Sequence, residues 1–175
     1  GESAQGDWGV AGYIMIGSKK RKVSYFVMVL CHSRMMFVKF TLSEAQEAWN
    51  ECHRDAFRYF GGIPEKVMVD NCKTAVIRNA PGEEVKLNDS YVDLAAHYGF
   101  KIVACNVRQP QEKGRVENGV GYVRQSFING RSLDPFELLN VEVATWLDEV
   151  ANIRIHGTTA KRPKDMFAEE GLSAL

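Results

Sequence analysis

Val67-Met68-Val69-Asp70-Asn71 is the stretch that decides the fold of this chain. A short apolar run with turn-forming residues at its end is typical of a strand that is buried on both faces of a sheet. Open α/β sheets bind their ligands beyond the carboxyl ends of such strands. The stretch therefore predicts an α/β architecture, and it makes Asp70 a candidate for chemistry.

The residues before this stretch predict an antiparallel meander followed by a helix. Three strands are expected: a first that ends with residues 13–16, a second at 23–30 and a third at 35–40, with a polar turn at 17–22 and a short turn at 31–34. Ser43 and Gln46 have the spacing of a capping box, and apolar residues then keep helical spacing until Gly61.

The residues after it alternate between helices and a strand. Asn88 and Gly99 bracket a second helix, and residues 102–105 are expected to form a strand. Val116 to Phe127 mark a third helix. A fourth helix starts at Asp134-Pro135 and continues to about Ala151. The order is β-β-β-α-β-α-β-α-α, which predicts an α/β fold: a mixed sheet with helices on both faces. Nothing marks a second domain, so residues 1–175 are expected to form one.

The amino-acid composition narrows the classes of function that this chain could have. Lys and Arg number 22, as do Asp and Glu, so any nucleic-acid contact must come from local basic clusters. No apolar run has the length of a membrane span, and no secretory signal is visible. Neither of the glycine-rich nucleotide-binding patterns, GxxxxGK[ST] or GxGxxG, is present, which disfavours a nucleotide-dependent enzyme.

Three acidic residues stand out by position. Asp7 lies on the first strand, Asp70 ends the buried run, and Glu117 lies near the start of the third helix. Carboxylates from adjacent strands and a crossing helix can converge on Mg²⁺, and two such ions can stabilise both oxygens of a phosphodiester displacement. Each residue taken singly also has an ordinary explanation: a strand-edge charge, a turn residue and an acid favoured at a helix N-terminus.

Four segments resemble, in order, the catalytic core of DDE-type transposases and retroviral integrases: Gln5-Gly6-Asp7-Trp8, Val69-Asp70-Asn71, Pro110-Gln111-Glu112-Lys113-Gly114-Arg115-Val116-Glu117-Asn118, and His156-Gly157-Thr158-Thr159 with Arg162-Pro163. The resemblance covers nearly the whole chain and is strongest to IstA-type transposases of the insertion-sequence-twenty-one family. The spacing from Asp70 to Glu117 is longer than in the retroviral pattern, which we interpret as an insertion near residues 79–84.

The resemblance implies a ribonuclease-H-like fold in which Asp7, Asp70 and Glu117 are the catalytic, metal-binding residues. It implies Mg²⁺, or Mn²⁺ in its place, with two ions per site. It also implies two reactions, cleavage at transposon ends and transfer of the freed 3′-hydroxyl to target DNA. The implied partners are the DNA, other transposase subunits and an AAA+ helper ATPase, and the implied location is the cytoplasm, at the bacterial nucleoid. The chain is then expected to be a fragment of a longer transposase. A nuclease that only hydrolyses, and a non-enzymatic DNA-binding or assembly domain, remain the alternatives.

Several cations are candidates for DNA contact. Lys73, Lys113, Arg115 and Arg124 lie near the predicted carboxylates in sequence, and each could equally be a solvated surface charge. Residues 19–22, Lys-Lys-Arg-Lys, fall in the predicted turn, where a solvated loop or a DNA-backbone contact would explain them.

Glu112 competes with Glu117 for the third carboxylate. The two would be roughly 140° apart around a helix, so a site on one helix face can use only one of them. Glu117 is preferred because it lies inside the predicted helix between Val116 and Val120.

Overall fold

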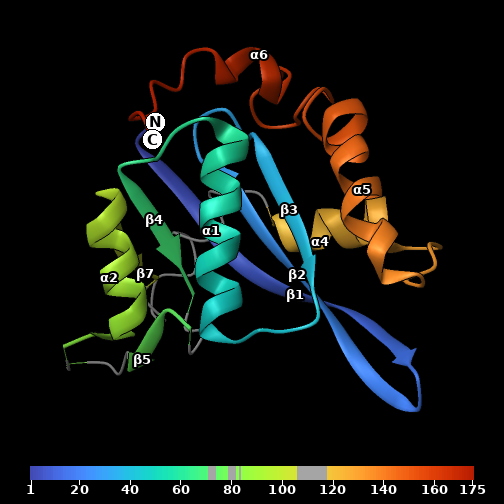
Figure 1. The fold of residues 1–175 in the computed structure, drawn as a ribbon. Helices are drawn as coiled ribbons and strands as arrows, with labels where there is room; N and C mark the ends of the chain where they lie inside the picture. The colour runs from blue at the N-terminus through green and yellow to red at the C-terminus, as the bar shows by residue number, and fades with distance from the viewer. Residues whose placement is uncertain (71–73, 79–81, 83, 106–117) are drawn as a thin grey trace.

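The fold is a five-stranded mixed sheet in the order β3-β2-β1-β4-β7, with helices on both faces (Figure 1). It is seen in a computed structural model that describes residues 1–70, 74–78, 82, 84–105 and 118–175. The elements are β1 (Ser3–Ile16), β2 (Lys19–Leu30), β3 (Met36–Thr41), α1 (Gln46–Phe60), β4 (Lys66–Val69), β5 (Val76–Arg78), β6 (Lys86–Leu87), α2 (Asp89–Tyr98), β7 (Lys101–Ala104), α4 (Gly119–Val123), the π-helical turn η1 (Arg124–Ile128), α5 (Phe136–Trp146), the π-helical turn η2 (Leu147–Ala151) and α6 (Pro163–Phe167).

β1 is the central strand of this sheet. It pairs antiparallel with β2, and β2 pairs antiparallel with β3, so the first three strands form the predicted meander. On its other side β1 pairs in parallel with β4, and β4 pairs in parallel with β7. α1 supplies the crossover that a parallel return requires, and Gly61 ends it in the left-handed conformation at φ 70°.

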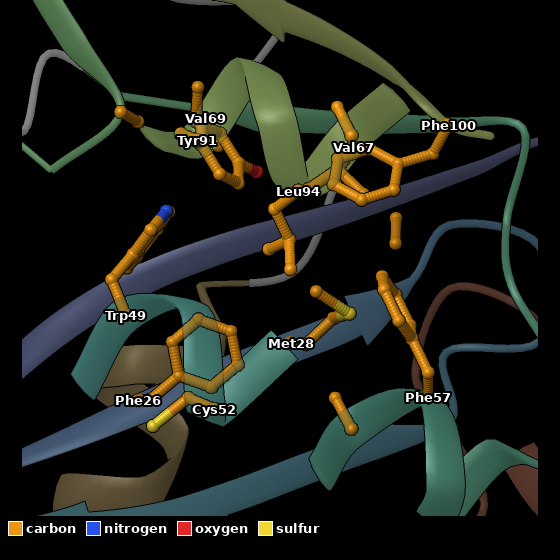
Figure 2. Close-up of a cluster of buried hydrophobic side chains, with 14 of the residues drawn as sticks. Phe26, Met28, Trp49, Cys52, Phe57, Val67, Val69, Tyr91, Leu94 and Phe100 are labelled. Atoms are coloured by element: carbon orange, nitrogen blue, oxygen red, sulfur yellow. The ribbon is translucent and has the colours of Figure 1, made fainter. Parts of the chain in front are cut away.

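Each face of the sheet carries its own core. Side chains of β1, β2 and β4 pack with α1 and α2 on one face, where Phe26, Trp49 and Tyr91 are fully buried (Figure 2). The opposite face packs against α4, η1 and α5 through residues such as Val27 and Phe127. Because successive strand residues point to opposite faces, β2 is apolar almost continuously from Val23 to Leu30.

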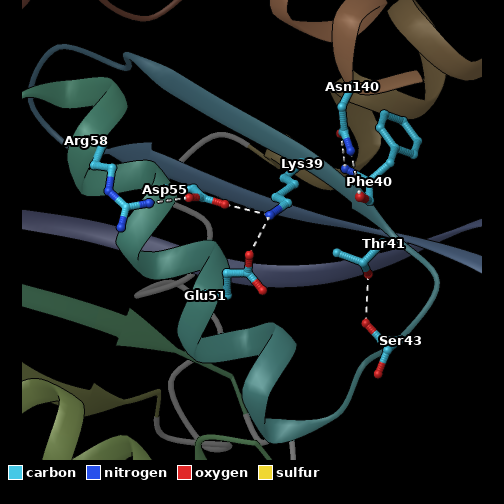
Figure 3. A network of polar contacts seen from close by, with 8 residues as sticks. All are labelled: Lys39, Phe40, Thr41, Ser43, Glu51, Asp55, Arg58 and Asn140. Atoms are coloured by element: carbon cyan, nitrogen blue, oxygen red, sulfur yellow. Dashed lines mark hydrogen bonds and ion pairs between the residues drawn. The ribbon is translucent and has the colours of Figure 1, made fainter. Parts of the chain in front are cut away.

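Side chains protect the outer edge of β3. Asn140 accepts from the Phe40 backbone N–H at 2.7 Å and donates to the Phe40 carbonyl at 3.0 Å (Figure 3). Asn152 makes the same pair of bonds to Met36, at 2.9 and 3.0 Å. Both asparagines thus occupy backbone N–H and carbonyl groups that a neighbouring strand would otherwise use, which protects this edge of the sheet from pairing with another chain. On the outer surface Lys39 bonds to Asp55 at 2.6 Å.

The predicted α/β class, mixed sheet and helices on both faces are confirmed, and the element order differs from the predicted one by the additional strands β5 and β6 between β4 and α2. Two local predictions are wrong. The turn between β1 and β2 is confined to residues 17–18, and residues 19–22 belong to β2. Ser43 and Gln46 form no capping box, since α1 has no side-chain cap and Gln46 donates to Asn50 instead. The predicted loop at 79–84 falls between β5 and β6, which pair as a two-stranded ribbon, and residues 79–81 and 83 of it lie outside the described residues.

Candidate active site

The two predicted aspartates lie side by side in the register of the sheet. Gly6 of β1 pairs with Val69 of β4; Asp7 is the next residue of β1, and Asp70 directly follows the end of β4. Parallel neighbours are about 4.8 Å apart across a sheet. Val67 and Val69 pack on the α1 face, so alternation directs Asp70 to the α4 face. Asp7 pairs with Val27, which packs on the α4 face, so both carboxylates share that face.

Trp8 anchors the backbone that carries Asp7. Its backbone N–H donates to Asp7 Oδ1 at 2.8 Å. Its indole points to the opposite face, where the ring lies 5.9 Å from Phe26 and 5.6 Å from Trp49, and its Nε1 donates to Thr74 Oγ1 at 3.4 Å. A large aromatic side chain locked into one core therefore holds the carboxylate that projects from the other face.

The start of α4 is packed directly against the strand beside Asp7. Asn118 caps this helix by accepting from the Gly121 N–H at 3.0 Å. Gly119 is so close to the sheet that a Cβ there would lie 2.9 Å from Val27 Cγ1 and 3.0 Å from Val29 Cγ2. Only glycine allows this approach, and it brings the first turn of α4 to the residue that pairs with Asp7.

Tyr25 of β2 holds α4 against the sheet through a hydrogen bond. Its ring covers Gly9, where an added Cβ would meet Tyr25 Cζ at 2.4 Å, and its hydroxyl donates to the Val120 carbonyl at 2.9 Å. Burial raises the pKa of Tyr25, and the nearby Arg124 guanidinium opposes the shift. The phenol therefore remains protonated and keeps its role as a donor.

Arg124, one of the predicted DNA contacts, is exposed and donates from its guanidinium to the Val10 carbonyl. That bond joins the end of α4 to β1 three residues beyond Asp7. The other predicted site residues, Glu117, Lys73, Lys113 and Arg115, lie outside the described residues, as does Glu112.

Sequence reasoning missed Tyr25, Gly9 and Gly119. Tyr25 is one of eight successive buried residues of β2, so its position carried no sign of a special role. Gly9 and Gly119 each directly follow a segment that was singled out, and the glycine in that position was the available signal.

The donors at this edge suit a hard cation. Carboxylate oxygens are what Mg²⁺ prefers, and two carboxylates on adjacent strands leave coordination positions for substrate oxygens. Gln5 lies one pleat before Asp7 on the same face; it is 8% exposed, and its Oε1 has no hydrogen-bond partner among the described residues. Within the described part of the chain, no three His, Cys, Asp or Glu side chains form a cluster that could hold a metal.

Residues 1–110 match the integrase core domain family, and the chain belongs to it. Its ribonuclease-H-like fold matches the HTLV-2 integrase catalytic core in complex with magnesium, with a TM-score of 0.62, 16% identity and 95% of each chain covered. The BIV integrase catalytic core matches with a TM-score of 0.63 and 13% identity over 96% of this chain and 94% of that one.

Sequence relatives are bacterial transposases. A putative transposase for the insertion sequence element IS5376 of Geobacillus stearothermophilus is 40% identical over all of this chain and 44% of its own length. The transposase for IS21 of Pseudomonas aeruginosa is 35% identical over 95% of this chain and 42% of its own length. The predicted resemblance is thereby confirmed, and the chain spans less than half the length of either relative.

Among the described residues, no helix is both long and apolar enough to cross a bilayer.

Proposed function

We propose that this chain is the catalytic domain of a DNA transposase, which cleaves a phosphodiester at a transposon end and joins the freed 3′-hydroxyl to target DNA. The observation that carries the proposal is that Asp7 and Asp70 each directly follow one residue of the Gly6–Val69 pair, on adjacent strands and beside the start of α4. The family and the transposase relatives give that placement its chemistry.

Glu117 is the proposed third carboxylate. It precedes Gly119 by two residues, and two residues of chain span at most about 7 Å. Gly119 in turn contacts Val27, which pairs with Asp7. Covalent connectivity thus supports a location for Glu117 within side-chain reach of the two aspartates. Glu112 is separated from Gly119 by a longer segment and is not constrained in this way.

Asp7, Asp70 and Glu117 would hold Mg²⁺, or Mn²⁺ in its place, and two ions at one site is the arrangement we favour. The metal, when bound, supplies positive charge against the phosphodiester oxygens and lowers the pKa of an attacking water. The residues of the chain would fix its ligands: Trp8 holds the backbone and one carboxylate oxygen of Asp7, while Tyr25 holds the helix that follows Glu117.

The partners of such a domain would be transposon-end DNA, target DNA and further transposase subunits, with an AAA+ helper ATPase as in insertion-sequence-twenty-one systems. Lys73, Lys113, Arg115 and Arg124 remain the proposed DNA contacts near the site. A cytoplasmic, nucleoid-associated location follows from such a substrate. We also propose that residues 1–175 act as one domain of a longer transposase.

The test is replacement of either aspartate. Asp7→Asn and Asp70→Asn should each abolish end cleavage in Mg²⁺ and the joining of precleaved ends, because the ligands would be lost while the packing is kept. Asp165→Asn, an exposed aspartate on α6, is the matched control and should retain both reactions. A thermal melt checks that all three variants fold. Near-wild-type cleavage by either site variant would refute the assignment, and cleavage without joining by the unaltered chain would identify a nuclease.

A further inference from the structure

β1 and β2 continue beyond the sheet as a projecting two-stranded arm, residues 12–23 (Figure 1, lower right). The register between the strands shifts between Val10 and Gly12, which is a bulge that bends and twists the ribbon. Ile14 packs at the base of the arm, where it is only 8% exposed, and Leu133 lies against Gly12. The arm is therefore attached to the α4 and α5 side of the domain, the side that carries Asp7.

The arm is strongly basic although the whole chain is neutral. Residues 12–23 contain four Lys or Arg and no Asp or Glu, so 18 cations and 22 acids remain for the rest of the chain. Strand alternation distributes the four cations over both faces of the ribbon. Arg21 pairs with Ile14 and shares the face of Asp7 together with Lys19, while Lys20 and Lys22 lie on the opposite face.

Two of the four cations are held at the base of the arm and two are presented near its tip. Lys22 forms an ion pair with Glu44 at 2.9 Å, and Arg21 donates to the Leu42 carbonyl at 3.3 Å. Lys19 and Lys20 have no ion-pair partner among the described residues, and Lys20 lies over the Tyr13 ring at 4.6 Å. These two ammonium groups are thus available to an external anion.

Apolar side chains are exposed between these cations. Tyr13, Met15 and Ile16 are 56%, 58% and 44% exposed. An apolar ribbon alone would suit a protein partner, but four cations without an acid oppose contact with a second copy of the same arm. Cations interspersed with apolar side chains suit the backbone of a nucleic acid, where phosphates alternate with sugars that offer apolar surface.

The length of the arm matches the dimensions of duplex DNA. Gly17, in the turn that follows β1, is ten residues beyond Asp7. At about 3.3 Å per residue this is about 33 Å, or about ten base pairs at 3.4 Å each. A duplex whose scissile phosphate lies at Asp7 would therefore run past the tip about one helical turn away.

We propose that the β1–β2 arm binds the phosphate backbone of duplex DNA about one helical turn from the catalytic carboxylates, with Lys19 and Lys20 as the contacting cations. This inference rests on the proposed function, since it assumes that the domain acts on DNA. Of residues 19–22, it assigns the DNA contact to Lys19 and Lys20, in place of the solvated turn that their composition first suggested.

The test is the salt dependence of binding to a labelled 40-base-pair duplex of mixed sequence, measured in EDTA so that no cleavage occurs. Each lost phosphate contact lowers the slope of log K against log salt by about 0.9, so K19Q/K20Q should lower it by about 1.8. K161Q/K164Q removes the same charge from the α6 end of the molecule, opposite the arm, and should leave the slope unchanged (Figure 1). K19R/K20R should retain the wild-type slope, and thermal melts confirm folding.

The outcomes separate this inference from the proposed function. If the unaltered chain binds the duplex and K19Q/K20Q binds with the same slope, the arm is not a DNA contact, while the proposed function stands. If the unaltered chain shows no salt-dependent binding, the arm proposal fails, and the proposed function is decided separately by the cleavage and joining assays of Asp7→Asn and Asp70→Asn. If Tyr13→Ser with Met15→Ser breaks self-association in sedimentation without changing DNA affinity, the arm is a protein interface and the inference is overturned.

Discussion

Gly119→Ala should lower the cleavage rate, because it adds a methyl group where α4 contacts the sheet. The added Cβ would lie 2.9 Å from Val27 Cγ1 and 3.0 Å from Val29 Cγ2, whereas ordinary contact begins near 3.4 Å. The start of α4 must therefore withdraw from the sheet by at least 3.4 − 2.9 = 0.5 Å. Val27 is fixed in the sheet beside Asp7, so the helix moves relative to the aspartates.

The magnitude follows from this displacement. A misplacement of about 1 Å can cost about 100-fold in rate, so we expect a loss of roughly 10- to 100-fold in cleavage. Overpacking typically costs about 1–3 kcal/mol, partly offset by the better helix propensity of alanine, which is worth up to about 1 kcal/mol. The unfolding midpoint should fall by a few degrees, and DNA affinity in EDTA should not change.

The assay is end cleavage with a thermal melt alongside, and Gly157→Ala is the control, since a Cβ at Gly157 meets no atom within 4 Å. Val27→Ala removes the nearer methyl, so the double variant with Gly119→Ala should recover part of the lost rate and show a favourable coupling energy. Wild-type cleavage and melting by Gly119→Ala would refute the reasoning that this contact positions the helix.

Two further predictions concern the third carboxylate and a buried histidine. Glu117→Gln should eliminate metal-dependent cleavage, whereas Glu112→Gln should leave most of it; the reverse result would exchange their roles. His53 is fully buried, and burial lowers its pKa to about 4 from 6.5, so the unfolded chain binds its proton first as the pH falls. Stability should therefore decrease by about 2 kcal/mol between pH 8 and pH 5, measured by urea unfolding. His53→Gln should remove that decrease, and an unchanged pH dependence in the variant would show that other groups cause it.

Local patterns in the sequence determined much of this protein. The run from Val67 to Val69 is a strand, Asn88 caps α2 and Gly99 ends it, because alternation, capping and left-handed glycine are decided within a few residues. The four segments around Asp7, Asp70, Glu117 and His156, taken in their order along the chain, were sufficient to indicate the family.

Local patterns failed where long-range pairing decided the outcome. Residues 19–22 have the composition of a turn, yet they form a strand because β1 pairs with them residue by residue as far as Ile16. Charged residues are poor strand formers by themselves, but pairing satisfies their backbone groups while their side chains stay in water.

The candidate site likewise combines features that the sequence determined with features that only the tertiary structure decided. The sequence by itself identified Asp7 and Asp70 as carboxylates suited to binding a metal ion. Only the tertiary structure decided that Gly6 pairs with Val69, so that the two aspartates are neighbours, and that Gly119 contacts Val27, so that α4 begins beside them. Register and close packing join residues far apart in the chain, and a shift of one residue would send a carboxylate to the other face of the sheet.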